Sequence, residues 1–360
     1  MPEYVSGEKH LKNFLLHDLD WYRKNRISLH LDTAISDIDP SQKTITATTG
    51  ATYPYDKLLI ATGGFSFVPP IKGADQDGVF TLRTVDDADA LKTRTASATS
   101  ATSAIVIGGG LLGLEAGNGL RKAGLGVSVV EFFPRLLPRQ MDITGGNILK
   151  TQLEAMGFLF YLGATTREII PGGNGLAVIL DGGETLSADM VLISAGVRPE
   201  VRLAEIIGLA IDKGIVVDDT MQTSREDIYA AGDVIEHRGR FYGIWPASMA
   251  QGRATGANMA GKKTVYEGTI PTNLLKVVGI DLFAAGTIDG EEKSPSSVFK
   301  NEHSYIYRKI VTRDDRIVGT ILLGDVHGQK EIERAIASGT NIGAYKKQIT
   351  DPRFDFAGLQ

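Results

Sequence analysis

The chain has 360 residues, no cysteine and a formal net charge of -5 at pH 7. This length is enough for about two or three domains with a large buried core. The acidic balance, without a block of basic residues, argues against nucleic acid and anionic membrane surfaces as partners. The lack of cysteine excludes a disulfide, a thiolate metal site, an iron–sulfur cluster and a cysteine nucleophile on this chain.

Small molecules are therefore the expected ligands. No apolar run approaches the roughly 18 residues that span a bilayer, and the first residues do not resemble a signal peptide. We expect a cytoplasmic protein without a membrane segment. The six histidines are scattered without metal-ligand spacing, so we expect structural or surface histidines and no metal site.

The N-terminal part of the chain predicts a helix, a hairpin and a buried strand. HLKNFLLHDLDWYRKNRI (10–27) has the composition of an amphipathic helix, and LHLDTAISDID (29–39) leads into a hairpin. YDKLLIATGG (55–64) is an apolar run that ends in small residues and glycine. Such a run is typical of a buried strand that stops where a ligand can approach the backbone.

The strongest motif is AIVIGGGLLGLEAGNGLRKAGLGVSVVE (104–131). An apolar strand leads into a GxGxxG pattern, a helix over 111–123 and a second strand. In this pattern the glycines allow a tight turn, close approach of a pyrophosphate and close helix-to-strand packing. Free N–H groups at the helix start then hold the phosphates. The expected contacts come from Gly108, Gly109, Gly110, Leu111, Leu112 and Gly113. A glycine-rich turn without a ligand is the alternative.

Glu131 ends the second strand of this motif, at the distance from Gly108 where dinucleotide-binding folds carry an acidic residue. An acidic side chain at this place accepts hydrogen bonds from the adenosine ribose and repels a 2′-phosphate. The motif therefore favours NADH over NADPH. Arg135 and Arg139 lie close by in the sequence and would soften that preference.

ADMVLISAGV (188–197) repeats the phrase found at 55–64, which indicates two related modules. Coincidence between two buried strands is the alternative. The GxGxxG pattern begins at Gly108 and the closing strand of its module at Asp189. The same spacing counted back from Asp56 falls before Met1. We therefore expect the first module to lack its phosphate-binding half.

The rest of the chain predicts a strand and a small further domain. TSREDIYAAGDV (223–234) reads as a strand that ends at Gly232 and Asp233, where a carboxylate can bind a ribitol hydroxyl or cap a helix. YIYRKIVTRDDRIVGTILLG (305–324) predicts two strands around an Asp-Asp turn, followed by a helix over 329–338 that ends at Gly339. TRTASATSATS (93–103) predicts a flexible connection, and KKQITDPRFDFAGLQ (346–360) a loosely ordered tail.

Together these motifs resemble the FAD-dependent pyridine nucleotide-disulfide oxidoreductases, in particular their cysteine-free branch. That branch contains NADH:rubredoxin and ferredoxin reductases and the flavoprotein part of assimilatory nitrite reductases. The family's FAD domain normally begins with its own GxGxxG, and this chain departs by starting after it. The matching segments, which cover nearly the whole chain in family order, are YDKLLIATGG (55–64), LRTVDDADAL (82–91), AIVIGGGLLGLEAG (104–117), VVEFFPRLLPRQMD (129–142), LISAGVRP (192–199), TSREDIYAAGDV (223–234) and SMAQGRATGANMAG (248–261).

The resemblance implies an α/β fold with two dinucleotide-binding (Rossmann-like) modules, the first incomplete, plus a small C-terminal α/β domain. It divides the chain into an FAD-binding domain (1–90 and 200–262), an NAD-binding domain (91–199), a C-terminal α/β domain (263–340) and a tail (341–360). The implied cofactors are FAD and NADH. The implied activity is an NADH-dependent reductase, monomer or homodimer, that passes electrons to rubredoxin or ferredoxin. The alternative is a non-enzymatic NAD-binding or interaction protein without flavin.

The resemblance also assigns roles to single residues. Glu115 matches a catalytic position near flavin and nicotinamide, although a carboxylate favoured by a helix N-terminus is the alternative. Arg83 matches a residue that touches flavin, or forms a surface ion pair. Ile35 matches a position whose backbone meets adenine, or packs in a core strand. The other implied contacts, at the flavin-side turn, the nicotinamide turn and the ribityl chain, come from Ala61, Thr62, Gly63, Ala195, Gly196, Val197, Gly232 and Asp233.

Overall fold

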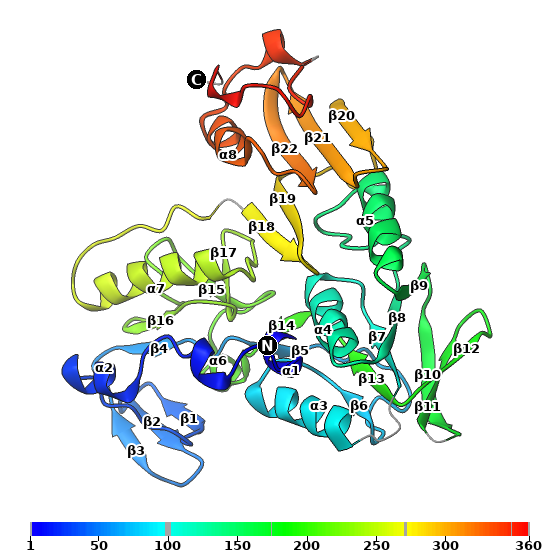
Figure 1. Ribbon diagram of the computed structural model, residues 1–360. Coiled ribbons are helices and arrows are strands. Elements are labelled where there is room, and N and C mark those ends of the chain that lie inside the picture. The colour runs from blue at the N-terminus through cyan, green and yellow to red at the C-terminus, as the bar shows by residue number, and fades with distance from the viewer. Residues whose placement is uncertain (1, 98–101, 174, 270–271, 347, 359–360) are drawn as a thin grey trace. The chain divides into compact units, whose positions relative to one another are not determined.

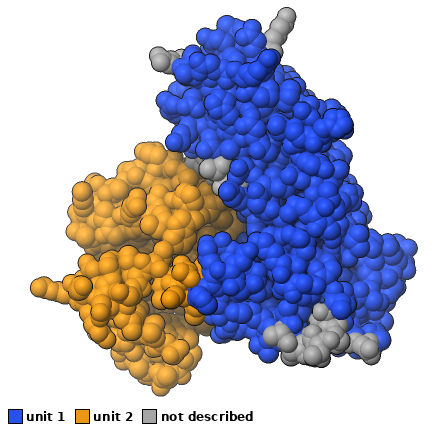
Figure 2. Space-filling view, in the orientation of Figure 1, with its two compact units in different colours: residues 1–10, 66–196, 270–360 blue, residues 11–65, 197–269 orange. Residues whose placement is uncertain are grey.

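The computed structural model of the protein describes residues 2–97, 102–173, 175–269, 272–346 and 348–358. The chain forms two compact units (Figure 2). Unit 1 consists of residues 1–10, 66–196 and 270–360, and unit 2 of residues 11–65 and 197–269. The domain boundaries expected from the sequence stay a prediction. Within the described ranges, no helix combines the length and the apolar character needed to cross a bilayer.

A five-stranded parallel sheet forms the centre of unit 1 (Figure 1). In spatial order its strands are β6 (Val79–Phe80), β13 (Met190–Ile193), β7 (Ser103–Ile107), β8 (Gly126–Glu131) and β9 (Phe158–Leu162). Helix α4 (Leu111–Lys122) connects β7 to β8, and α5 (Ile143–Ala155) lies between β8 and β9 in the chain. The strand, helix and strand predicted over 104–131 are therefore confirmed, and parallel strands with helical crossovers give a Rossmann-like module.

Unit 1 also contains α1 (Pro2–Val5), α3 (Val85–Ser97) and a three-stranded antiparallel sheet of β10 (Thr166–Gly172), β11 (Gly175–Leu180) and β12 (Thr185–Ala188). The predicted flexible connection is wrong for residues 93–97, because α3 continues through them; residues 98–101 lie outside the described residues. Ala88 and Leu91 of α3 are fully buried. Their burial stabilises the helix despite its Thr- and Ser-rich end.

The C-terminal part of unit 1 is an antiparallel sheet covered by a helix. Its order is β18 (Thr272–Val277), β19 (Ile280–Gly286), β22 (Arg316–Leu323), β21 (Ile306–Arg313) and β20 (Ser296–Asn301). The turn residues Asp314 and Asp315 have φ of 50° and 59°, which suits a two-residue hairpin. Helix α8 (Gln329–Ser338) ends at Gly339 with φ of 64°. Both the hairpin and the helix were predicted, and both are confirmed.

The end of the chain packs against this sheet. It contains the short 3-10 helices η2 (Gly343–Tyr345) and η3 (Phe356–Gly358). Ile342, Ile349 and Phe356 are buried in one cluster with Ile332 of α8. The prediction of a loosely ordered tail is therefore wrong for the described part of 346–360. The error arose because a few well-spaced apolar side chains suffice to anchor a segment whose average composition is polar.

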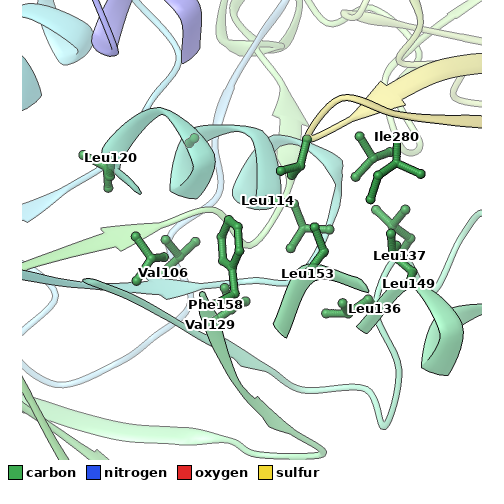
Figure 3. Packing of buried hydrophobic residues seen from close by; sticks show 14 of the residues in the cluster. Val106, Leu114, Leu120, Val129, Leu136, Leu137, Leu149, Leu153, Phe158 and Ile280 are labelled. Atoms are coloured by element: carbon green, nitrogen blue, oxygen red, sulfur yellow. The ribbon is translucent and has the colours of Figure 1, made fainter. Parts of the chain in front are cut away.

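The parallel sheet and the C-terminal sheet share one hydrophobic core (Figure 3). Leu114 of α4 and Leu149 of α5 lie in it together with Ile280 of β19, and all three are almost fully buried. Burial of each such side chain contributes about 1.5–3 kcal/mol to folding. The parallel sheet and the C-terminal sheet of unit 1 therefore stabilise each other.

Unit 2 is built from short strands. β1 (Ile35–Asp39), β2 (Thr44–Ala47) and β3 (Thr52–Pro54) form an antiparallel sheet, as predicted for the hairpin. The other strands form pairs, of which the first two are parallel: β4 (Leu58–Ile60) with β16 (Ile228–Ala230), β15 (Ile215–Val217) with β17 (Ile235–His237), and β5 (Gly64–Ser66) with β14 (Val197–Pro199). The helices are α2 (Leu19–Lys24), α6 (Arg202–Ile206) and α7 (Trp245–Met259).

The single amphipathic helix predicted over 10–27 is wrong. The structure has a 3-10 helix, η1 (Leu11–Phe14), and then the short α2. Asp18 separates them, since its side chain accepts a hydrogen bond from Trp21 N at 2.8 Å and begins α2 as its N-cap. A residue that favours the N-cap conformation interrupts a helix that apolar spacing alone would continue. Leu15 and Leu16 consequently stay exposed.

A buried ionic cluster joins the start of α5 to strand β21 of the C-terminal sheet. Asp142 is the N-cap of α5 and accepts from Gly145 N at 2.8 Å. Its second oxygen accepts from Tyr307 Oη at 2.6 Å and lies 2.9 Å from Lys309 Nζ. All three side chains are almost fully buried, and burial together with Asp142 raises the pKa of Tyr307. The cluster thus fixes β21 against the start of α5.

Replacing Lys309 tests this cluster. Lys309→Met leaves the buried Asp142 carboxylate without its charged partner, a change that typically destabilises by about 3–5 kcal/mol. We expect a loss of this size in the free energy of unfolding, measured by urea denaturation. Lys300→Met is the control, because Lys300 forms an exposed pair with Glu302 that contributes at most about 1 kcal/mol. Equal losses in both variants would contradict the role of the cluster.

Candidate functional site

The GxGxxG loop lies at the carboxyl end of β7, and its three motif glycines have different surroundings. Gly108 has φ of 121°, and a Cβ there would lie 2.2 Å from Ser194 O. A Cβ on Gly113 would lie 2.1 Å from Gly108 O, so helix and loop pack too closely for any side chain. A Cβ on Gly110 would meet nothing within 4 Å. The loop is therefore tightly packed on its protein side and open beside Gly110.

Helix α4 begins directly after this open position. Gly110 is its N-cap and supplies no side chain to accept from the first turn of the helix. Leu111 and Leu112 are the first helical residues, and Leu112 is half exposed. Backbone N–H groups at such a helix start attract anions, and the helix dipole adds to the attraction. The geometry therefore fits a phosphate group beside Gly110.

Glu131 connects this loop to the end of β8. Its side chain is buried, and one carboxylate oxygen accepts from Gly109 N at 2.6 Å. The other oxygen accepts from Phe133 N at 2.8 Å. A carboxylate offers about four acceptor positions, so these two bonds orient it and leave capacity for hydroxyl donors. The predicted ribose-binding residue thus lies at the glycine loop.

The strand next to β7 ends at the same edge of the sheet. β13 pairs with β7 in parallel, with Ile193 opposite Ile107, and Ser194 N donates to Ile107 O at 2.8 Å. Ala195 and Gly196 follow, and Gly196 has φ of 115°. Val197 then begins β14. The structure therefore brings the turn expected beside nicotinamide to the same sheet edge as the glycine loop.

Unit 2 repeats this arrangement on a smaller scale. β4 pairs with β16 in parallel, with Ile60 opposite Ala230. Past these ends, Gly63 and Gly232 have φ of 68° and 87°. The phrase shared by 55–64 and 188–197 therefore corresponds to the same local structure in both units, a strand that stops in a left-handed glycine turn beside a parallel neighbour.

Hydrogen bonds fix both turns of unit 2. Thr62 Oγ1 donates to Glu200 O at 2.7 Å, and Glu200 N donates to Gly63 O at 2.9 Å. Gly232 N donates to Gln251 Oε1 at 2.9 Å, and Gln251 is fully buried on α7. The nearest atom to a Cβ on Gly232 would be 3.8 Å away. Ala61 and Thr62 thus lie opposite a roomy glycine turn on the neighbouring strand.

Asp233 follows that turn and is half buried. The next element is the strand β17 and not a helix, so Asp233 is not a helix N-cap here. A carboxylate beside an open glycine turn suits a hydroxyl-bearing ligand. Gln251, which holds the turn, was missed by the sequence analysis. It belongs to the matching segment 248–261, but only its burial and its bond to Gly232 N reveal the role.

The remaining residues assigned from the sequence lie elsewhere. Ile35 begins β1, packs against the core of unit 2 and accepts at its carbonyl from Arg202 Nη2 at 3.1 Å. Arg83 belongs to unit 1 and precedes α3, where its N–H donates to Asp87 Oδ2 at 2.7 Å. Their cofactor contacts stay predictions.

Glu115 makes a contact that the sequence did not predict. Its carboxylate accepts from Val278 N at 2.9 Å. Val278 and Gly279 form the turn between β18 and β19 and have φ of 55° and 84°. A branched residue rarely adopts this left-handed conformation. Val278 is nevertheless buried in the shared core, so core packing and the Glu115 bond together stabilise a strained turn. Burial raises the pKa of Glu115.

Two substitutions of Glu115 distinguish the effect of losing the hydrogen-bond acceptor for Val278 N from the effect of losing the negative charge. Glu115→Ala leaves the Val278 N–H without its acceptor and should destabilise by about 1–3 kcal/mol, whereas Glu115→Gln keeps a carbonyl oxygen. Since folding raises the pKa of Glu115, the folded state binds the proton more readily than the unfolded state. The stability contributed by this group is therefore lost as pH rises through the raised pKa.

We expect to see this in urea titrations at two pH values, one near the ordinary glutamate pKa and one neutral. Between the acidic and the neutral buffer, the free energy of unfolding of the wild type should fall relative to that of Glu115→Gln. Parallel pH curves for the two proteins would contradict this.

Residues 3–253 match the family described as pyridine nucleotide-disulphide oxidoreductase, and residues 271–340 match the rubredoxin NAD+ reductase C-terminal domain. These two matches cover most of the chain. The second match begins close to the start of β18, where the C-terminal sheet begins.

Relatives and solved structures agree with these matches. The chain is 36% identical to an assimilatory nitrate reductase electron transfer subunit of Bacillus subtilis, over 98% of this chain and 45% of that protein. It is 31% identical to an NADH-rubredoxin oxidoreductase of Clostridium acetobutylicum, over 94% of this chain and 84% of that one. The crystal structure of NADH:rubredoxin oxidoreductase from the same organism superposes with a TM-score of 0.83 at 28% identity, covering 97% of this chain and 87% of the other. The chain spans less than half the length of several nitrate and nitrite reductase relatives.

Proposed function

Because the chain belongs to the pyridine nucleotide-disulphide oxidoreductase family, we propose that it is an NADH-dependent flavoprotein reductase that passes electrons to a small iron protein. The observation that carries this proposal is the glycine loop at the end of β7 with Glu131 bound to it. The match of residues 271–340 to a rubredoxin reductase domain supports the class of acceptor. The 360 residues contain no cysteine, so they supply no redox-active disulfide.

Unit 1 would hold NADH. The N–H groups at the start of α4 would bind the pyrophosphate, where Gly110 leaves open space. Glu131, already oriented by Gly109 N and Phe133 N, would accept from the ribose hydroxyls. Ala195 and Gly196 would border the nicotinamide, because their turn follows the neighbouring strand at the same edge. The contact expected from Val197, the first residue of β14, stays a prediction.

Unit 2 would hold part of FAD. Its open turn at Gly232 and the following carboxylate of Asp233 fit a polyol chain, and the turn at Thr62 and Gly63 would border the flavin. When bound, flavin accepts a hydride from NADH and releases electrons one at a time. The chain's own residues position the two cofactors and exclude water. Glu115 would act through the position of the β18–β19 turn, since its carboxylate binds Val278 N.

The proposed acceptor is rubredoxin or ferredoxin, and the proposed location is the cytoplasm. Rubredoxin and putidaredoxin reductases occur among the relatives and the structural neighbours, which supports a small iron protein as the class of partner. The proposed oligomeric state is a monomer or a homodimer.

Flavin content and electron transfer test the proposal. The purified protein, supplied with FAD, should show the visible absorbance of oxidised flavin and should reduce rubredoxin or ferredoxin with NADH. Gly113→Ala should abolish NADH-driven reduction while flavin absorbance remains, because the new Cβ collides with Gly108 O in unit 1. Gly182→Ala, whose Cβ meets nothing within 4 Å, should keep wild-type rates. Binding of NADH without flavin or acceptor reduction would instead indicate a non-enzymatic NAD-binding protein.

Nucleotide choice tests the position of Glu131. Hydrogen bonds to a charged group contribute about 1.5–3 kcal/mol each, so NADH should bind at least about tenfold more tightly than NADPH. Glu131→Ala should weaken the binding of NADH and remove the repulsion of the 2′-phosphate of NADPH. The difference between the affinities for NADH and NADPH should therefore become smaller. The measurement is the dissociation constant of each nucleotide for both proteins. Equal wild-type affinities would show that Glu131 does not bind the ribose.

A further inference from the structure

Two exposed phenylalanines follow Glu131 directly. Phe132 is 66% exposed and Phe133 is 45% exposed. Each ring has a large apolar area, and covering that area with a ligand lowers the free energy of the system. Single exposed apolar residues need no explanation, but an adjacent pair beside a proposed ribose-binding carboxylate forms an apolar surface at the nucleotide site.

Hydrogen bonds fix the backbone of this pair to Glu131 and to the segment that follows β9. Phe133 N donates to Glu131 Oε1 at 2.8 Å, and Phe133 O accepts from Gly163 N at 3.0 Å. The Glu131 carbonyl accepts from Ala164 N at 3.0 Å. The exposed rings therefore extend from a fixed strand end.

The two rings also hold each other. Their centroids lie 5.3 Å apart and their planes are inclined by 88°, which is edge-to-face packing. Because the pair is ordered before a ligand arrives, stacking on it costs less conformational entropy than stacking on a mobile side chain.

We propose that Phe132 and Phe133 form the platform on which the adenine of NADH stacks, an inference that rests on the proposed NADH binding. Adenine is bonded to the ribose that Glu131 would hold, so the base must lie beside the end of β8. Stacking uses only the π face of the base and does not depend on the 2′ position of the ribose. The pair therefore adds affinity for NADH and NADPH alike, while Glu131 discriminates between them.

The test compares ligands with and without adenine. Phe132→Ala/Phe133→Ala should weaken NADH by about 5- to 150-fold, the range found when an aromatic platform for a base is truncated. The ratio of NADH to NADPH affinity should stay at its wild-type value. Binding of reduced nicotinamide mononucleotide, which lacks the adenosine half, should not change. Phe132→Tyr/Phe133→Tyr should retain NADH affinity because it retains both rings.

Leu159→Ala is the matched control, because Leu159 is 61% exposed on the neighbouring strand β9, away from Leu162, which pairs with Glu131. Leu159→Ala should leave the affinities for NADH, NADPH and reduced nicotinamide mononucleotide unchanged. Unaltered NADH binding by the double alanine variant overturns the inference while the proposed function stands. An equal loss for nicotinamide mononucleotide also overturns it, because the effect is then not on adenine. A wild-type protein that binds no nucleotide rejects the proposed function together with this inference.

Discussion

Parallel strands that stop together at one edge of a sheet are the constraint on which the candidate site depends. Neighbouring parallel strands place their carboxyl ends side by side, so the turns that follow them must share a small space. In unit 1 this space is so tight that Gly108 and Gly113 admit no Cβ, whereas Gly110 is left open. The same close packing brings Gly109 N within hydrogen-bond distance of Glu131. The open space beside Gly110 and the position of the Glu131 carboxylate thus both result from the way the turns pack at this sheet edge.

The local elements of this site could be predicted because their signals are local. Strand, glycine loop, helix and terminal carboxylate follow one another within 104–131, and each reflects a backbone requirement of its own neighbourhood. The turn at Asp314 and Asp315 and the end of α8 at Gly339 belong to the same class. Composition failed where a few apolar contacts outweighed an average, as in α3 and the final segment of the chain.

The features that could not be predicted join residues far apart in the sequence. Nothing in the sequence around Glu115 indicates that it accepts from Val278 N, 163 residues later. The buried Gln251 that fixes the Gly232 turn, and the exposure of Phe132, likewise depend on which faces other segments cover. Such contacts depend on tertiary packing, and the residue pattern of a short sequence segment does not show which distant segments will pack against it.

The ionic cluster at the start of α5 limits how freely the C-terminal sheet can be exchanged in protein engineering. Residues 271–340 match a family domain of their own, which invites the view of an independent module. Yet Asp142 lies outside that segment, and its buried partners Tyr307 and Lys309 lie within it. A chimera that imports this segment from a relative must therefore also import or rebuild the helix cap and the apolar surface of α5. The residues that must be exchanged together therefore include the start of α5 as well as the segment 271–340.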